Sequence, residues 1–310
     1  MMKRSVKIGT RGSKLALWQA NWVKSAIGEE HPSFSVELVP IKTKGDKILD
    51  VPLAKVGGKG LFVKEIEDAL LEGRIDLAVH SMKDMPSEIP GGLCIGAIPE
   101  RESPNDVLIA RKGELLSELR PGAIIGTSSL RRAAQLKYVR PDIEILPLRG
   151  NLDTRIRKLE TENMDAIVLA AAGVKRLGLE SRITEYMDEN IMLPAVGQGA
   201  LCIEIRKSDP EIEGVVNFLN HRETEAIVKG ERAFLHRLEG GCQIPIAAHG
   251  KIKNSTFTLC GLVADVNGTT IIKDTLSGPV ESSESIGVRL ADRLLEKGAK
   301  PILETLRAEV

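Results

Sequence analysis

Four arginines of this sequence stand where an apolar, strand-like segment gives way to a helix-like one. Such junctions lie at the carboxyl ends of the strands of an open α/β sheet, which is where these sheets bind ligands. A guanidinium beside the free N–H groups of a helix N-terminus favours a carboxylate or a phosphate. The pattern therefore predicts an anion-binding cleft. The four residues are Arg11, Arg131, Arg132 and Arg149.

Serine hydroxyls precede two of these junctions. Ser13 stands before a predicted helix that begins at residue 14, and Ser128 and Ser129 stand before one over residues 130–139. Serine is a favourable N-cap residue, so we expect these hydroxyls at the helix starts. The basic stretch 131–158 also has a plainer interpretation as a solvated helix face. We prefer that interpretation for Lys137, Arg140, Arg157 and Lys158.

An acidic residue follows another strand-like segment, residues 76–81. Lys83 could hold an anion there, and Asp84 is the one acid of a loop that otherwise suits anions. A carboxylate in a basic cleft stays ionised and can stabilise a cation formed during a reaction. The alternative is that both residues only decorate a turn before Pro86. Spacing alone leaves the two interpretations of Asp84 equal.

A glycine-rich segment over residues 57–60 is too short for a phosphate-binding loop. It lacks the spacing that such loops require. We interpret it as a lid, with Lys55 and Lys59 available to anions.

Cys242 follows two glycines at the predicted end of a helix over residues 222–238. A helix C-terminus does not lower the pKa of a thiol, so a repeatedly used thiolate is disfavoured. A single, permanent attachment of a prosthetic group is compatible with this position. So is a loop cysteine without a role, and spacing alone favours that plainer alternative. The spacing of the four cysteines, which are Cys94, Cys202, Cys242 and Cys260, indicates no metal site.

Strands and helices alternate along the first two thirds of the chain, which predicts mixed or parallel sheets covered by helices. Two segments repeat: residues 8–10 match residues 125–127, and residues 76–79 resemble residues 165–168. We therefore expect two similar α/β domains that face one cleft. Beyond residue 219, three strands and flanking helices predict a smaller α+β domain.

Composition narrows the function classes. The chain has 310 residues, equal numbers of basic and acidic residues (43 each) and only 3% aromatic residues. Zero net charge and few aromatic side chains disfavour a nucleic-acid-binding protein. No segment has the apolar length of a signal peptide or a membrane span. We therefore expect a cytoplasmic location, no nucleic acid and no membrane.

Five motifs together resemble the porphobilinogen deaminase family. The resemblance spans nearly the whole chain, keeps the order of the motifs and shows no departure at a functional position. The motifs are residues 8–16 (IGTRGSKLA), 80–84 (HSMKD), 126–132 (GTSSLRR), 148–155 (LRGNLDTR) and 239–242 (EGGC).

The resemblance implies a fold of two α/β domains similar to type II periplasmic binding proteins, around a cleft, plus a smaller C-terminal α+β domain. It places domain 1 at residues 1–99 with 195–218, domain 2 at residues 100–194 and domain 3 at residues 219–310. It also implies a monomer.

The resemblance further implies a transferase that joins four porphobilinogen molecules head to tail, with loss of ammonia, into the linear tetrapyrrole hydroxymethylbilane. The chain would grow on a dipyrromethane cofactor bound to Cys242 by a thioether, and the product would pass to uroporphyrinogen-III synthase. No metal is implied. Asp84 would be catalytic.

The remaining implied site residues would bind carboxylates of the cofactor and the substrate. The expected cofactor-binding residues are Ser81, Lys83, Thr127, Ser129, Arg131, Arg132, Asn151 and Arg155. The expected substrate-binding residues are Arg11, Ser13, Gln19, Arg149, Arg155 and Arg176.

A two-lobed receptor for a small anion is the main alternative function. It would need no third domain and no covalent adduct. A nucleic-acid-binding protein that uses residues 131–158 is the second alternative, and a steep salt dependence of DNA binding would favour it.

Overall fold

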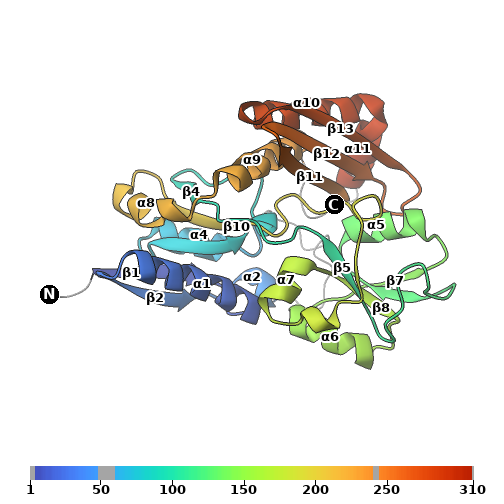
Figure 1. The fold of residues 1–310 in the computed structure, drawn as a ribbon, viewed down its shortest axis with the longest axis horizontal. Coiled ribbons are helices and arrows are strands. Elements are labelled where there is room, and N and C mark those ends of the chain that lie inside the picture. The colour runs from blue at the N-terminus through green and yellow to red at the C-terminus, as the bar shows by residue number, and fades with distance from the viewer. Residues whose placement is uncertain (1–3, 48–59, 240–243, 309–310) are drawn as a thin grey trace. The chain divides into compact units, whose positions relative to one another are not determined.

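The computed structural model describes residues 4–47, 60–239 and 244–308 (Figure 1). Its contacts divide the chain into two units. The first contains residues 1–48, 58–102 and 200–225, and the second contains residues 49–57, 103–199 and 226–310. Three sheets lie within these units, one in the first and two in the second.

A five-stranded mixed sheet in the order β2-β1-β3-β10-β4 forms the centre of the first unit. β1 pairs in parallel with β2 and β3, whereas β10 runs antiparallel to both β3 and β4. Helices α1 and α4 contact this sheet. The elements are β1 (Arg4–Thr10), α1 (Lys14–Glu30), β2 (Phe34–Pro40), α2 (Lys44–Lys47), α4 (Lys64–Leu71), β3 (Leu77–Ser81), β4 (Leu93–Ala97), β10 (Leu201–Arg206) and α8 (Pro210–Val216).

The second unit begins with a five-stranded mixed sheet in the order β7-β6-β8-β5-β9. β6 is parallel to β7 and β8, and β5 is antiparallel to β8 and β9. The elements are β5 (Asp106–Ala110), β6 (Ile124–Gly126), α5 (Leu130–Val139), β7 (Glu144–Leu146), α6 (Leu152–Thr161), β8 (Ala166–Ala170), α7 (Ala171–Arg176) and β9 (Glu185–Tyr186).

A three-stranded antiparallel sheet completes the second unit. Its core joins apolar residues of the strands to Phe234 and to α10 and α11. The elements are α9 (Arg222–Arg237), β11 (Ile246–Lys253), β12 (Thr256–Ala264), β13 (Ile271–Pro279), α10 (Ser283–Leu294) and α11 (Lys300–Ala308). This arrangement confirms the predicted smaller α+β region.

The two five-stranded sheets repeat one local design, as the sequence predicts. The Asp76 carboxylate accepts a hydrogen bond from the N–H of Lys7 at 2.8 Å, and Asp165 accepts one from the N–H of Ile124 at 2.8 Å. Each aspartate thereby ties the start of a central strand to its neighbour. The glycines of the repeat also match, since a Cβ at Gly9 or Gly126 would clash with the side chain that precedes each aspartate.

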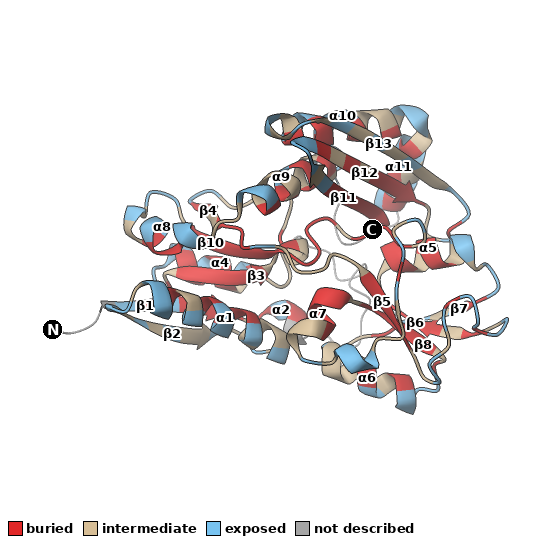
Figure 2. Cartoon of the chain, in the orientation of Figure 1, coloured by how far each residue is buried: buried red, intermediate tan, exposed pale blue. Residues whose placement is uncertain are grey.

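Buried apolar strands lie at the centre of the first sheet. Four of five residues of β3 and five of six residues of β10 are buried, and both strands are coloured as buried in Figure 2. The sequence predicted β3 but did not predict β10, which enters the sheet from more than 100 residues later in the chain. The domain boundaries inferred from the resemblance stay a prediction.

Candidate functional site

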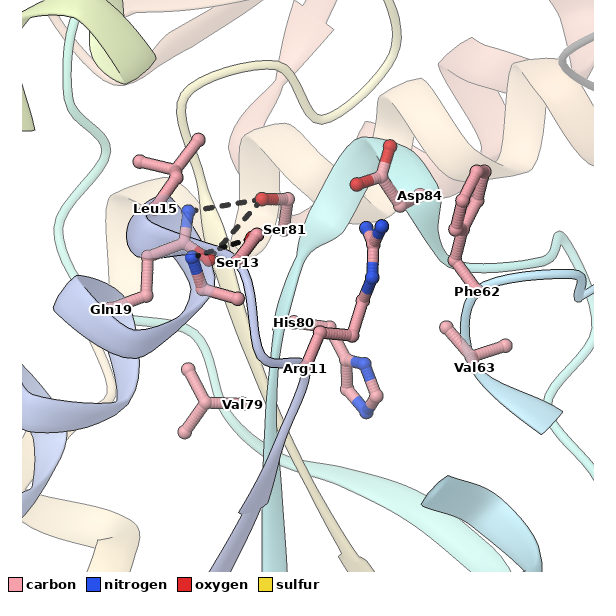
Figure 3. A pocket seen from close by; sticks show the side chains of 11 residues that line it. Arg11, Ser13, Leu15, Gln19, Phe62, Val63, Val79, His80, Ser81 and Asp84 are labelled. Carbon is pink, nitrogen blue, oxygen red and sulfur yellow. Dashed lines mark hydrogen bonds between the residues drawn. The ribbon is translucent and has the colours of Figure 1, made fainter. Parts of the chain in front are cut away.

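A pocket lies in the first unit where β1 and β3 end (Figure 3). The start of α1 and the segment before α4 complete its wall. Its lining residues are Arg11, Ser13, Leu15, Ala16, Gln19, Phe62, Val63, Val79, His80, Ser81 and Asp84. The pocket thus brings together five of the predicted site residues, which are Arg11, Ser13, Gln19, Ser81 and Asp84.

Arg11 presents a cation to this pocket. Its guanidinium carbon lies 4.3 Å from the centre of the Phe62 ring, a distance suited to a cation–π contact. Figure 3 shows the guanidinium directed toward the carboxylate of Asp84. The pocket thus combines a positive and a negative group on a partly apolar wall.

Asp84 ends a short 3₁₀ turn, Met82–Asp84, that follows β3 directly. The turn is anchored because Met82 is buried and its N–H donates to the carbonyl of Ala200 at 3.0 Å. The N–H of Met85 closes the turn on the Met82 carbonyl. This anchoring places the half-buried Asp84 at the strand end, whereas the sequence also allowed a simple solvated turn.

Ser13 caps helix α1, as predicted, because its hydroxyl accepts a hydrogen bond from the N–H of Ala16 at 3.2 Å. Gln19, one turn further along α1, donates its side-chain amide to the Ser81 hydroxyl at 3.0 Å. This bond joins α1 to the end of β3. The pair therefore holds two walls of the pocket together.

His80 continues the pocket wall below the surface. Its side chain is 3% exposed, and its Nε2 lies 3.2 Å from Oε2 of Glu204 on β10. Sequence reasoning missed Glu204 because β10 itself was not predicted. A charged residue within an otherwise apolar strand was the available signal.

Arg131 and Arg132 lie in the second unit, at the start of α5, and both are buried. The Nη1 and Nη2 atoms of Arg131 lie 2.7 and 3.2 Å from the carboxylate oxygens of Asp106, and Nε of Arg132 lies 2.9 Å from that carboxylate. Gln198 also donates to Asp106, at 3.1 Å. Sequence reasoning missed Asp106, which opens the apolar strand β5.

Two guanidiniums that share one carboxylate leave an excess of positive charge in this cluster. Burial lowers the pKa of Arg132, and the charge of Asp106 opposes that shift. A further anion would balance the second cation, and each planar guanidinium carries five N–H donors. The cluster therefore suits a ligand with several carboxylates.

The hydroxyls before α5 differ from the prediction. Ser129 occupies the N-cap position, but its side chain makes no capping hydrogen bond among the described residues. The Ser128 hydroxyl instead donates to the carbonyl of Leu148 at 3.0 Å, and the buried Thr127 hydroxyl accepts from the N–H of Ser129. The expected side-chain cap at this helix is therefore wrong, since the Ser128 hydroxyl binds loop backbone and Ser129 makes no capping bond to a described residue.

The other predicted residues of the second unit lie at ends of β7, α6 and α7. Asn151 caps α6 by accepting from the N–H of Thr154, and Nε of Arg155 donates to the carbonyl of Gly150 at 2.8 Å. Arg149 is partly exposed at the same turn. Arg176, at the end of α7, donates to the carbonyl of Gly199 at 2.7 Å.

Several expectations concern residues outside the described part of the chain. Cys242, Lys55 and Lys59 are among them. The predicted attachment point and lid therefore stay predictions. Within the described residues, Cys94, Cys202 and Cys260 form no disulfide with one another, and no group of His, Cys, Asp or Glu could hold a metal ion. No described helix is long and apolar enough to cross a membrane.

Family models match most of the chain. Residues 6–214 match the porphobilinogen deaminase dipyrromethane cofactor binding domain, and residues 226–296 match the porphobilinogen deaminase C-terminal domain. Among solved structures, the substrate binding domain of a putative molybdenum ABC transporter from Clostridium difficile is similar at a TM-score of 0.44 and 10% identity. That similarity covers 70% of this chain and 92% of the other.

Curated relatives are similar over their full length. A porphobilinogen deaminase from Pelobacter propionicus is 56% identical and covers 98% of each chain. One from Geobacter metallireducens is 56% identical, with 100% of this chain and 98% of the relative covered. One from Carboxydothermus hydrogenoformans is 53% identical, with 99% of each chain covered.

Proposed function

Because the chain belongs to the porphobilinogen deaminase family, we propose that it joins four porphobilinogen molecules head to tail into hydroxymethylbilane. In each condensation the aminomethyl C–N bond breaks and releases ammonia. A C–C bond then forms between that methylene carbon and the free α-carbon of the preceding pyrrole, which loses its proton. Water finally releases the linear tetrapyrrole.

The presence of Arg11 and Asp84 in the wall of one pocket is the structural observation that carries this proposal. A substrate that bears an acetate and a propionate needs a guanidinium to hold it. A substrate that becomes a cation when ammonia leaves needs a carboxylate at the reacting carbon. The geometry supports Arg11 as a substrate-binding residue and Asp84 as the residue that stabilises the cation and the pyrrole N–H groups.

The family's dipyrromethane cofactor suits the second unit. Within the described residues, Arg131 and Arg132 share the one carboxylate of Asp106, so their buried excess charge fits a group that bears carboxylates. We propose that these arginines hold the cofactor, with Ser129, Asn151 and Arg155 at neighbouring loop and helix ends. When bound, the cofactor supplies the first free pyrrole α-carbon. Its attachment to Cys242 by a thioether is part of the proposal.

Lys83, Ser81 and Thr127 complete the proposed cofactor-binding residues. Ser13, Gln19, Arg149 and Arg176 complete the proposed substrate-binding residues. Ser13 and Gln19 line the pocket itself, which supports their assignment, and Lys55 and Lys59 would close over the bound anions. A monomeric enzyme in the cytoplasm that passes its product to uroporphyrinogen-III synthase completes the proposal.

The intact mass of the purified protein tests the proposal directly. The wild-type protein should carry two pyrrole units, and Cys242→Ser should carry none. Cys260→Ser is the matched control and should keep the adduct. A wild-type protein without an adduct that also leaves porphobilinogen unconsumed would instead support the two-lobed anion receptor.

A further inference from the structure

Two buried carboxylates, those of Glu204 and Glu67, lie behind the pocket, and Glu204 contacts His80. Glu204 and His80 lie on adjacent antiparallel strands, with Glu204 opposite Ala78 and Cys202 opposite His80. Side chains two residues apart on a strand point to the same face of the sheet. His80 and Glu204 are therefore diagonal neighbours on one face, which explains their 3.2 Å contact.

Helix α4 covers the same face. Ala78 packs with Ile66, Ala69 and Leu70 of this helix. Glu67 lies between these apolar residues in the sequence and is itself only 6% exposed, while Glu204 is fully buried. The second acid is therefore brought to the first by the packing of α4 on β3 and β10.

Among the described residues, each of the two carboxylates has one oxygen without a hydrogen bond. Oε1 of Glu67 and Oε1 of Glu204 make no hydrogen bond within the described part of the chain. A buried carboxylate oxygen without a donor is costly, whereas a protonated carboxyl can itself donate. The like charge of Glu204 favours the protonated form of Glu67.

Burial and the charge of Glu204 raise the pKa of Glu67 to about 7. Asp68 raises it slightly further and Lys64 opposes the shift, both from α4. His80 on β3 lies on the same face as Glu204. Cys94 on β4 pairs with Ile205, so its side chain lies on the other face of the sheet. Glu67 therefore titrates near neutral pH.

We propose that His80, Glu204 and Glu67 form a proton relay that accepts the proton lost by the substrate pyrrole in each condensation. The inference rests on the proposed function and adds residues to it. His80 is the only member of the relay that lines the pocket. Glu204 and Glu67 therefore act through it as positioning and proton-storing residues.

Over one cycle the relay accepts one proton and returns one proton. The α-carbon C–H bond breaks as the ring regains aromaticity, and its proton goes to the ring nitrogen of His80 that does not face Glu204. His80 passes its Nε2 proton to Glu204, which shares it with Glu67. The reverse transfer delivers the stored proton to the aminomethyl nitrogen of the next porphobilinogen, which then leaves as ammonia, and it restores the starting tautomer of His80.

The pH profile of turnover tests the relay. The relay accepts a proton only when Glu67 is ionised, so wild-type kcat should rise with pH to a plateau above about pH 7. Glu67→Gln removes the like charge beside Glu204, which should move this limb at least about one pH unit to the acid side, roughly a tenfold change in proton affinity. A glutamine is neutral and of similar shape, so the fold should survive.

Glu72→Gln is the matched control because Glu72 is exposed at the end of the same helix. It should reproduce the wild-type profile. Glu204→Gln should lower kcat several-fold and abolish the limb near neutral pH. Profiles of Glu67→Gln and Glu204→Gln that only scale the wild-type curve would overturn the relay.

Infrared titration of the holoenzyme gives a second readout that does not depend on turnover. The carbonyl stretch of a protonated carboxyl should disappear with a midpoint of about pH 7 in the wild type and be missing in Glu67→Gln. A wild type without this titration contradicts the relay alone. A wild type that shows it but does not consume porphobilinogen contradicts the proposed function instead.

Discussion

At the scale of single residues, the chemistry depends on charges that oppose each other across short distances. Arg11 lies against Phe62 and points toward Asp84. In the proposed function, Asp84 stabilises a cationic reaction centre while Arg11 holds an anionic substrate group. Substitution of the two residues should therefore affect turnover and binding differently.

Asp84→Asn should lower kcat by at least about 100-fold, because an amide cannot neutralise a developing cation or carry its proton. Cofactor attachment should survive, since Asp84 is not among the residues proposed to bind the cofactor's carboxylates. Rates of porphobilinogen consumption and the intact mass would check both statements. Near-normal turnover in the folded variant would remove Asp84 from the mechanism.

A second residue-scale prediction concerns the two arginines that share the Asp106 carboxylate. Either Arg131→Leu or Arg132→Leu leaves one arginine paired with this carboxylate, so each variant should fold. Each should lack the cofactor because the excess positive charge is gone. Wild-type yields of the mass adduct in both variants would refute this assignment.

Asp106→Leu should behave differently, because it leaves two buried guanidiniums without their shared carboxylate. We expect a loss of about 3–5 kcal/mol in the free energy of unfolding, measured in urea. A variant as stable as Arg132→Leu would show that Asp106 does not hold the cluster.

At the scale of elements, both five-stranded sheets contain the same hydrogen bond between an aspartate carboxylate and a backbone N–H of the neighbouring strand. Asp76 binds the N–H of Lys7, and Asp165 binds the N–H of Ile124 together with Arg120. Asp76 thereby fixes the start of β3 beside β1, and Asp165 fixes the start of β8 beside β6. The strands that deliver Asp84 and the turn before α5 therefore depend on equivalent contacts.

Asp165→Ala should lower the free energy of unfolding by about 1–3 kcal/mol, because the N–H of Ile124 loses its acceptor. Asp153→Ala, a substitution of an acid on the neighbouring helix α6, is the control and should change stability less. Equal effects of the two substitutions in urea unfolding would argue against the link.

At the scale of the whole molecule, one glutamate side chain connects two segments that are distant in the chain. Glu189 lies 3.1 Å from Nδ1 of His249 and 2.7 Å from Nζ of Lys251 on β11. Both are in the second unit. The bond to His249, followed by that to Lys251, lowers the pKa of Glu189 to about 2. This pair links the end of the second mixed sheet to the antiparallel one.

Glu189→Gln should lower the stability of the protein at pH 7 by about 1–2 kcal/mol after allowance for partial exposure. A lowered folded-state pKa stabilises the protein above the unfolded value of 4.5 and ceases to do so as pH falls toward 2. Urea unfolding of wild type and variant should therefore converge between pH 4.5 and pH 2. A constant difference across that range would contradict the assignment.

Local patterns in the sequence were enough to predict the elements that carry the site. The strand ending at Thr10, the cap at Ser13 and helix α5 follow from apolar spacing and helix-start signals, which act within a few residues. The repeated Ile-Gly-Thr and aspartate segments predicted two related sheets. The motif order was sufficient to identify the family and hence the cofactor.

Only the tertiary structure decided which buried charges meet. Asp106 reaches Arg131 because β5 joins β8 at the sheet centre, and Glu204 reaches His80 because β10 inserts from far along the chain. Strand order is set by packing between distant segments, and no short-range pattern encodes it. Ser128 before α5 shows the same limit, since its hydroxyl donates to the loop carbonyl of Leu148 and does not cap the helix.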